Sequence, residues 1–373
     1  MASQVEINNP LAVGINGDLN MPPASMNNVF YYAPGPATVF SLRDTANAVL
    51  TPSNAGLYLD ITGGAGVASF SGSDFGDQFI GGLNDDFLIG YLGNDTLEGG
   101  AGFDSLNGGA GIDTASYEHS GAGVLADLSN AGNNTGDAQG DTYTSIENLR
   151  GSRFSDTLTG NAGDNILNDG GLGGADKLTG GGGDDSYSVY NAGTAIVENS
   201  GEGTDRVNAG VDYVLASGIS AEYLNTTSVH ATYAINLTGN EIKQLVRGND
   251  GGNVLDGAGG NDWLFGMGGS DTFRFSTALS NGNVDKIMDF NVAEDQIALS
   301  SSIFAALGVG ALDASAFKDS FLAPRDADDR IIYNSNTGSL FYDADGSGNA
   351  FAAVKFAVLA SGLSLTAADF VVI

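Results

Sequence analysis

Carboxylates recur at a fixed spacing between Gly72 and Ser116. This stretch consists of five consecutive nine-residue segments, GSDFGDQFI, GGLNDDFLI, GYLGNDTLE, GGAGFDSLN and GGAGIDTAS. The sixth residue of every segment is an aspartate: Asp77, Asp86, Asp95, Asp104 and Asp113. Ca²⁺ takes six to eight oxygen ligands in flexible geometry, whereas Mg²⁺ requires a stricter octahedron. The spacing therefore predicts a series of calcium sites, completed by carbonyl groups of the Gly-rich backbone.

Each nine-residue segment has the composition of a turn followed by a short strand. Its Gly-rich half suits a tight turn, because Gly accepts positive φ without a Cβ clash. Its last three residues place one apolar side chain between two others, the pattern of a strand with one buried face. These apolar residues are Phe79, Leu88, Leu97, Leu106 and Ala115. A turn and a strand make half a coil, so two segments should close one coil.

This arrangement places the aspartates in two rows, one along each edge of the coils. Neighbouring strands lie about 4.8 Å apart, so the stacked carboxylates repel one another unless a cation lies between adjacent coils. The alternative interpretation is a Gly/Asp-rich linker or a set of ordinary hairpin turns. Five segments in register, with the apolar eighth position kept, favour the coils.

Two further blocks repeat the pattern and add candidate ligands. The second begins at Gly151 and reads GSRFSDTLT, GNAGDNILN, GLGGADKLT and GGGGDDSYS, with DG inserted before the third segment. The third runs from Gly248 to Arg274 and reads GNDGGNVLD, GAGGNDWLF and GMGGSDTFR. Their sixth positions are Asp156, Asn165, Asp176, Asp185, Asn253, Asp262 and Asp271.

A different motif, DADGSG, begins at Asp343 and matches the opening of an EF-hand loop. Its twelfth position is Val354, where an EF-hand requires a bidentate Glu. A complete EF-hand is therefore not predicted. Asp343 and Asp345 are either calcium ligands or part of a simple Asp-Gly turn.

The repeats divide the chain into alternating blocks and interruptions. The N-terminal stretch holds six of the seven prolines and is predicted as a β segment that caps the coils or mediates assembly. The predicted organisation is 1–62, N-terminal β segment; 63–117, 151–190 and 239–275, three repeat blocks; 118–150 and 191–238, connecting strands; and 276–373, a β-rich C-terminal cap.

Apolar residues at the seventh or ninth position of a segment should face away from the coil. Phe87, Ile80 and Ile89 are therefore predicted to need a cover, either the N-terminal segment or a partner chain. Trp263 and Phe265 face outward by the same argument. The C-terminal region is predicted to pack on them.

The charge of the chain argues against two classes of binding partner. Its 373 residues contain 45 acidic and 13 basic side chains, a net charge of −32. This charge argues against nucleic acid and anionic membrane surfaces as partners, and it opposes compaction of the metal-free chain.

There is no Cys, and no apolar run approaches the 18 residues of a membrane-spanning helix. MASQVEINNP lacks the basic and apolar regions of a Sec signal.

The motifs of common hydrolases are missing from the sequence. The two histidines, His119 and His230, lie in no H-E-x-x-H motif, and they are too few for a three-histidine zinc site. There is no G-x-S-x-G elbow and no phosphate-binding loop. No catalytic residue is therefore assigned and a non-enzymatic role is predicted, although 45 carboxylates leave acid pairs for glycoside hydrolysis open.

From about Gly63 to the C-terminus, the chain resembles the secreted RTX proteins of bacteria. The resemblance rests on the three nonapeptide blocks, on SIENLRGSRFSDTLTGN, on VDKIMDF followed by EDQIALS, and on RIIYNSNTGSLFYDADGSG. The last two are similar to the region that follows the repeats in serralysin-type proteins. The resemblance implies an all-β fold, a right-handed parallel β-roll in several blocks, with calcium-driven folding.

The resemblance also implies export by a type I secretion apparatus, which recognises an uncleaved C-terminal signal. The acidic and apolar residues Asp369 to Ile373 fit such a signal. Extracellular localisation agrees with weak calcium sites of about 0.1–1 mM, which cytosolic calcium would not fill. The repeats do not define an activity, because one fold carries many functions.

Three functions remain open at this point. The favoured one is a structural protein of a surface layer, filament or extracellular matrix that self-assembles with calcium. The others are a soluble effector or adhesin acting on host membrane or glycan, and an enzyme acting on extracellular polysaccharide.

Overall fold

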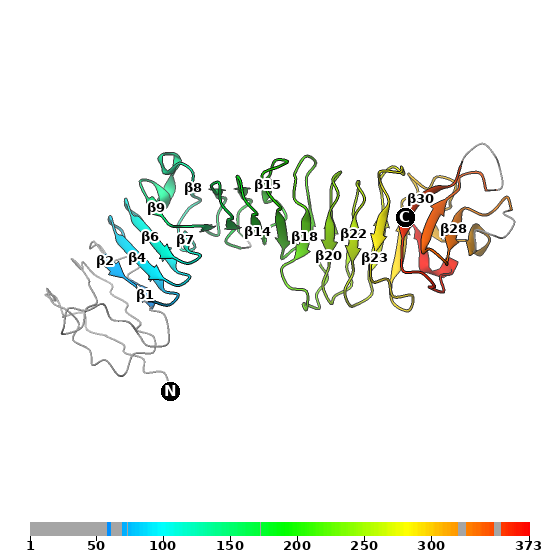
Figure 1. Cartoon of the computed structure of the whole chain (residues 1–373), viewed down its shortest axis with the longest axis horizontal. Coiled ribbons are helices and arrows are strands. Elements are labelled where there is room, and N and C mark those ends of the chain that lie inside the picture. Colours follow the sequence, from blue (N-terminus) through cyan, green and yellow to red (C-terminus); the bar gives the residue numbers. More distant parts are fainter. Residues whose placement is uncertain (1–57, 61–68, 73, 172, 320–325, 347–351) are drawn as a thin grey trace, which may run out of the picture. The chain divides into compact units, whose positions relative to one another are not determined.

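The computed structural model describes residues 58–60, 69–72, 74–171, 173–319, 326–346 and 352–373. The chain divides into two compact units, Met1–Val197 and Glu198–Ile373, which are described separately. The described residues form short strands and four single-turn 3₁₀ helices, with no α-helix among them. The all-β prediction is therefore confirmed, and Figure 1 shows the strands of each unit stacked as successive rungs. Strands predicted before residue 58 lie outside the described residues.

Three parallel sheets form the first unit. The longest has seven strands in the order β1 (Tyr58–Asp60), β3 (Gln78–Ile80), β5 (Thr96–Glu98), β7 (Thr114–Ser116), β10 (Asn148–Arg150), β12 (Ile166–Asn168) and β14 (Ser186–Val189). A second sheet contains β2 (Ser69–Ser71), β4 (Phe87–Leu92), β6 (Ser105–Ala110) and β9 (Thr142–Thr144). The third contains β15 (Ala195–Val197), β13 (Lys177–Thr179), β11 (Thr157–Thr159) and β8 (Leu125–Asp127).

The repeat determines both the pairing and the core. Successive strands of one sheet lie eighteen residues apart in the first block, so that Phe79 pairs with Leu97 and Phe70 with Leu88. The eighth-position side chains Phe79, Leu88, Leu97, Leu106 and Ala115 have no exposed surface. The Gly-rich halves form the turns. Gly102, for example, adopts a φ of 143°, and a Cβ there would lie 2.6 Å from the backbone of Asn84.

The interruption after the first block contributes one strand to each of the three sheets. β9 follows β6 in the second sheet, whereas β8 begins the third. Between them lie the 3₁₀ helices η1 (Ala131–Asn133) and η2 (Gly136–Ala138). The insertion therefore ends one row of strands and starts another, while β7 and β10 continue the longest sheet.

Most ninth positions of the first block are buried. Ile80, which was predicted to face outward beneath a cover, is 3% exposed and pairs with Asp60 of β1, and Glu98 and Ser116 are also buried. Glu98 accepts hydrogen bonds from the Ser116 hydroxyl and the His119 backbone N–H, which cover this edge. Ile89 is half-buried, and only Phe87 remains exposed as predicted, at 55%.

Two sheets form the second unit. One runs β16 (Arg206–Ala209), β18 (Tyr223–Thr226), β20 (Leu245–Arg247), β22 (Trp263–Phe265), β24 (Asp285–Ile287), β30 (Val354–Val358), β29 (Ser339–Tyr342), β28 (Ile331–Asn334) and β27 (Phe317–Asp319). The other runs β17 (Tyr213–Val214), β19 (Leu237–Thr238), β21 (Val254–Asp256), β23 (Thr272–Phe275), β25 (Gln296–Leu299), β31 (Phe370–Val372) and β26 (Gly310–Ala311).

The repeat strands of this unit are parallel, and the C-terminal part adds antiparallel pairs. β28 pairs with β29, β29 with β30, and β26 with β31 in antiparallel fashion. The helices η3 (Ala314–Ala316) and η4 (Ala367–Asp369) precede β27 and β31. The residues predicted as a secretion signal thus include a sheet strand, and Phe370 is 1% exposed.

The predicted cover over Trp263 is partial. Trp263 is 39% exposed, and the ammonium groups of Lys243 and Lys286 lie 5.3 and 5.6 Å from its ring centroid. Lys286 lies on β24, within the predicted C-terminal region, so this region does contact the ring. Lys243, which precedes β20, contacts it as well.

Candidate metal sites

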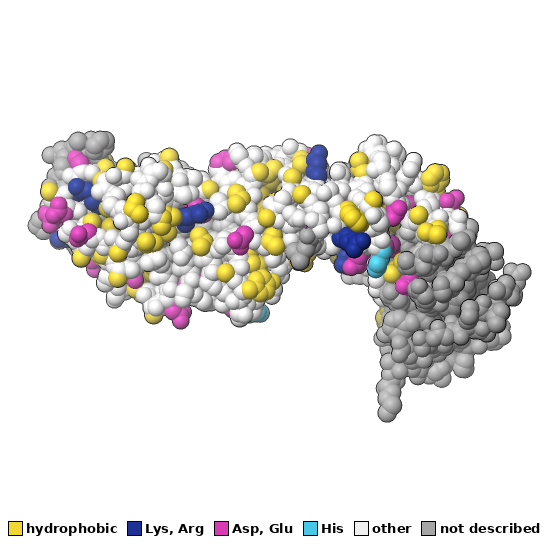
Figure 2. Space-filling model, turned by 180° about the vertical axis from the view of Figure 1, so that it is seen from behind, with side chains coloured by type: hydrophobic (Ala, Val, Ile, Leu, Met, Phe, Trp, Pro, Cys, Tyr) yellow, Lys and Arg dark blue, Asp and Glu magenta, His cyan; other side chains and the backbone are white. Residues whose placement is uncertain are grey.

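All twelve sixth-position residues of the three blocks are buried. Each lies immediately before a strand, at the end of a Gly-rich turn, and none is more than 3% exposed. They are Asp77, Asp86, Asp95, Asp104, Asp113, Asp156, Asn165, Asp176, Asp185, Asn253, Asp262 and Asp271. Figure 2 agrees with this burial, because Asp and Glu side chains occupy only small areas of the face shown, despite the 45 acids of the chain.

At several of these aspartates, one carboxylate oxygen links neighbouring coils. The backbone N–H of Asp77 donates to Oδ1 of Asp95 over 2.7 Å, and the N–H of Asp95 donates to Oδ1 of Asp113 over 2.8 Å. On the other edge, the N–H of Asp86 donates to Oδ1 of Asp104 over 2.7 Å. In the third block, the N–H of Asn253 donates to Oδ1 of Asp271. The aspartates thus fix the stacking of the coils through one oxygen.

The second oxygen is buried without a hydrogen-bond partner at five positions. They are Asp95, Asp104, Asp113, Asp262 and Asp271, whose Oδ2 atoms accept no hydrogen bond. Each of these oxygens faces the glycine that opens its own segment, where a Cβ would collide with it. At Gly90, the same Cβ would also lie 2.6 Å from the carbonyl oxygen of Gly108 in the next coil.

The carboxylate oxygen of Asp95 and the carbonyl oxygen of Gly108 therefore both lie close to Gly90, in space that a Cβ atom would otherwise occupy. A buried oxygen without a partner is costly unless a donor or a cation compensates it. An all-oxygen, partly carbonyl environment is the donor set that suits Ca²⁺. These residues fit a row of calcium ions between the coils.

The burial of these carboxylates disfavours their charged form. Desolvation is the largest cause, and it raises the pKa of Asp95 to about 7, with Asp77 and Asp113 adding to the rise. Desolvation together with Asp141 raises the pKa of Asp104 to about 8. Desolvation also raises the pKa of Asp271 to about 7. Without a cation, the fold therefore opposes ionisation at neutral pH.

Four acids that were not predicted as ligands accept the backbone N–H of a repeat aspartate in the same way. They extend this series of carboxylate-to-backbone bonds between coils, the carboxylate ladder. Asp141 and Glu147 accept the backbone N–H groups of Asp104 and Asp113. Asp285 and Asp295 accept those of Asp262 and Asp271. Each acid begins or precedes a strand, in DTYT, ENLR, DKIM and DQIA. The signal that could have found them is the strand half of the nonapeptide, an acid followed by an alternating triplet, without its glycines.

The asparagines at the sixth position have hydrogen-bond partners for both the nitrogen and the oxygen of their side-chain amides. Nδ2 of Asn253 donates to the carbonyl of Ile235 in the preceding coil over 3.0 Å, and Nδ2 of Asn165 donates to the carbonyl of Glu147 over 2.6 Å. Their Oδ1 atoms accept the N–H of Asn249 and of Asn161. A carboxylate cannot donate such a bond. The two asparagines predicted as ligands therefore join their coils by hydrogen bonds.

The substitution Asn253→Asp is expected to increase the calcium dependence of the second unit. It replaces a donor with a buried carboxylate and removes the bond to the Ile235 carbonyl, so a cation becomes the favourable partner of both oxygens. The measurements are melting temperature against calcium concentration and calcium stoichiometry. Asn281→Asp, at an exposed position, adds the same charge as a control. Identical calcium dependence of the two variants would contradict the role of Asn253.

Asp343 and Asp345 do not join the ladder. The backbone N–H of Asp345 donates to Oδ1 of Asp343 over 3.3 Å, and Gly346 follows at a φ of 65°. This is the geometry of an Asp-Gly turn at the end of β29. The following residues, 347–351, lie outside the described residues, and a calcium role for the pair stays a prediction.

Comparison with known proteins agrees with this geometry. The family model of the RTX calcium-binding nonapeptide repeat, which spans four copies, matches residues 71–106, 80–115, 141–168, 171–188 and 245–275. No curated protein matches the chain in sequence. The matched residues contain all twelve sixth positions and also Asp141 and Glu147. The chain therefore contains RTX-type nonapeptide repeats in a β-roll, and these repeats bind multiple calcium ions.

Proposed function

We propose that the protein is secreted and serves as a calcium-dependent structural element of a surface layer, filament or extracellular matrix. The observation that carries the proposal is the series of buried carboxylate oxygens without a hydrogen-bond partner in both units. Such sites make calcium part of the fold, so the free energy of binding becomes free energy of folding. A fold that forms only where calcium is abundant suits a protein that assembles outside the cell.

Secretion is supported by the calcium affinity expected of such sites. Extracellular calcium modules bind at about 10⁻⁴–10⁻³ M, far above cytosolic levels. A chain of net charge −32 stays extended by self-repulsion until cations reduce that charge. Among the described residues, no helix has the length and hydrophobicity of a membrane span.

The structural role is supported by exposed apolar side chains on the first unit. Five large apolar side chains between residues 87 and 112 are each at least 43% exposed: Phe87, Tyr91, Leu92, Phe103 and Ile112. Phe87 pairs with Ser105, two residues after Phe103, so Phe87 and Phe103 lie on the same edge of the roll and offer an apolar interaction surface there. A contact between this surface and a different part of the next molecule is head-to-tail and propagates.

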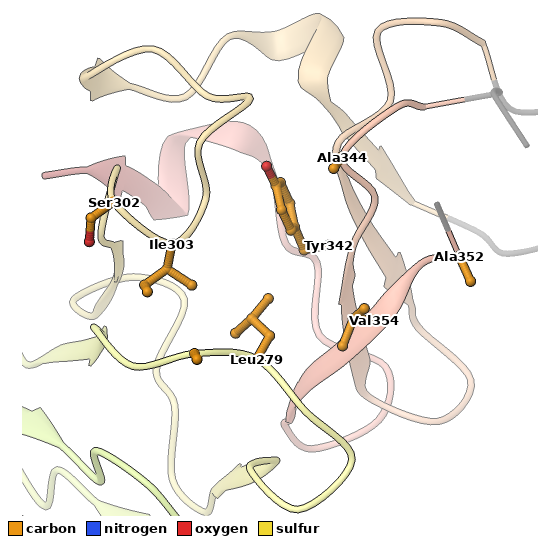
Figure 3. A pocket seen from close by; sticks show the side chains of 8 residues that line it. Leu279, Ser302, Ile303, Tyr342, Ala344, Ala352 and Val354 are labelled. Carbon is orange, nitrogen blue, oxygen red and sulfur yellow. The ribbon is translucent and has the colours of Figure 1, made fainter. Parts of the chain in front are cut away.

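A cavity in the second unit offers little acid–base chemistry. It measures about 560 Å³ and is lined by Leu279, Ile303, Val354 and small side chains, as Figure 3 shows. The hydroxyl of Tyr342, the one aromatic residue in its described lining, accepts the backbone N–H of Ala306. Neither a carboxylate nor a histidine is among the described residues that line it. The non-enzymatic role therefore remains our preferred interpretation.

Removing two exposed aromatic side chains is expected to abolish assembly while leaving the fold intact. Phe87 and Phe103 are 55% and 63% exposed, so Phe87→Ser/Phe103→Ser takes little from the core. Full-length protein in millimolar-range calcium should form particles visible by electron microscopy and light scattering, and the double variant should remain monomeric. Deletion of residues 1–50, the predicted assembly element, should have the same effect.

The matched control is Val214→Ser/Val309→Ser, at positions 67% and 76% exposed in the second unit, which should assemble normally. Monomeric full-length protein at high concentration and saturating calcium would refute the structural role. That result would favour a soluble effector or adhesin instead.

A further inference from the structure

The outer face of one sheet in the second unit differs from the rest of this acidic chain. Across β16, β18, β20, β22 and β24, one row of paired residues is buried: Val207, Leu224, Val246, Leu264 and Ile287. The flanking side chains therefore point to the opposite side. One row of paired positions runs Arg206, Tyr223, Leu245, Trp263 and Lys286, and a second runs Asn208, Asn225, Arg247 and Phe265. With Lys243, which precedes β20, these residues form the cationic face.

No acid occupies any of these positions, although the chain has 45 acids and 13 bases. Basic residues lie on every second strand, at Arg206, Arg247 and Lys286, and aromatic residues lie on the strands between them. The opposite sheet of the same unit is different. There Arg274 on β23 is neutralised by Asp256 on β21, over 2.8 Å. The absence of acids is therefore a property of this face and not of the fold.

Each cation of the face lies against an aromatic ring. The guanidinium of Arg206 is 5.0 Å from the ring centroid of Tyr223, and that of Arg247 is 5.5 Å from Phe265. Lys243 and Lys286 contact Trp263. Among the described residues, none of these four cations forms an ion pair. The aromatic rings position the cationic groups, but no described carboxylate neutralises their charge.

We propose that the cationic face binds an extended acidic polysaccharide, such as a glucuronate-containing chain, laid across the strands. Strands lie about 4.8 Å apart, so bases on alternate strands repeat about every 10 Å. This spacing is comparable with the length of two sugar rings in a linear glycan. Arginine pairs with a planar carboxylate through two parallel N–H groups.

The same contacts disfavour two other anionic partners. Single-stranded nucleic acid binds through bases stacked on open aromatic faces, whereas here every ring already carries a cation. A second copy of this chain would have to present a row of exposed carboxylates, but its regularly spaced acids are buried between coils. The inference goes beyond the proposed structural role, because it holds for the monomeric protein as well.

The test uses hyaluronan, a glucuronate polymer, and calcium-loaded full-length protein. Binding is measured by calorimetry in millimolar-range calcium at low salt, with neutral dextran for comparison. The face variant is Arg206→Gln/Arg247→Gln/Lys286→Gln. The control variant Arg153→Gln/Lys177→Gln/Lys318→Gln removes the same charge elsewhere. Circular dichroism and melting temperature establish that both variants fold.

Wild-type and control proteins should bind hyaluronan with similar Kd, and the face variant should bind at least about ten-fold more weakly, with a smaller dependence on salt. Absence of hyaluronan binding by the wild type, or equal weakening in both variants, would overturn the proposal. Tighter binding of a single-stranded oligonucleotide to the same face would replace the glycan with nucleic acid. Loss of self-association in the face variant, without loss of glycan binding, would assign the face to a second copy.

Discussion

In the absence of calcium, the full-length chain is expected to be largely unfolded at neutral pH and to gain β-structure when calcium is added. The buried aspartates would otherwise hold uncompensated charges, which the pKa values of about 7 and 8 at Asp95 and Asp104 reflect. The net charge of −32 adds repulsion along the whole chain. Circular dichroism in EDTA, and then in excess calcium, measures the change. A metal-free spectrum identical to the calcium-loaded one would contradict the expectation.

Lowering the pH should partly replace calcium in the same experiment. Folding raises the pKa of these carboxylates above their unfolded value of about 4, so the folded metal-free chain binds more protons than the unfolded one. The stability of the metal-free fold is therefore greatest below that value and decreases as the pH rises through about 7 to 8. In EDTA, β-structure should increase as the pH falls from about 8 to about 5. No change over this range would show that carboxylate burial does not limit folding.

The substitution Asp95→Ala is expected to raise the calcium concentration needed to fold the first unit by about ten-fold or more. Its Oδ1 accepts the backbone N–H of Asp77, and its Oδ2 is one of the buried oxygens without a partner. The change therefore removes a link between coils and a cation ligand together. The readout is the midpoint of a calcium titration followed by circular dichroism. Asp95→Asn, which resembles the natural amide positions, should be less damaging than Asp95→Ala.

The control for Asp95 must be an exposed carboxylate. Asp127 lies outside the glycine-rich repeats but is unsuitable, because its side chain accepts hydrogen bonds from Ser129, Asn130 and Asn133 and is 6% exposed. Asp74 is exposed, and Asp74→Ala removes the same charge from the first block. Equal calcium midpoints for Asp95→Ala and Asp74→Ala would mean that Asp95 has no special role in folding.

The regular part of the molecule could be predicted from the sequence because one pattern defines several levels of structure. The nine-residue period gave the strands, the parallel pairing eighteen residues apart, and the buried row that includes Leu88 and Leu97. It also gave the position of the carboxylates at the turn-to-strand junctions. These features depend on local geometry, so one chain is enough to deduce them.

Features that depend on irregular segments could not be predicted in this way. Asp141 and Glu147 continue the ladder from the far side of an insertion whose length nothing in the repeat defines. The burial of Glu98 depends on Ser116 of the next coil and on the turn at His119. The outward direction of Trp263 was predicted correctly, but its lysine neighbours lie 20 and 23 residues away, off the repeat.

The most direct test of the carboxylate ladder is a crystal structure of the calcium-loaded protein with an anomalous difference map. Peaks are expected between successive coils beside Asp95, Asp104, Asp113, Asp262 and Asp271, with carboxylate and carbonyl oxygens about 2.4 Å from each ion. No peak is expected beside Asn165 or Asn253, whose amides already bond to the preceding coil. Peaks of equal height beside the amides, or none beside these aspartates, would contradict the account.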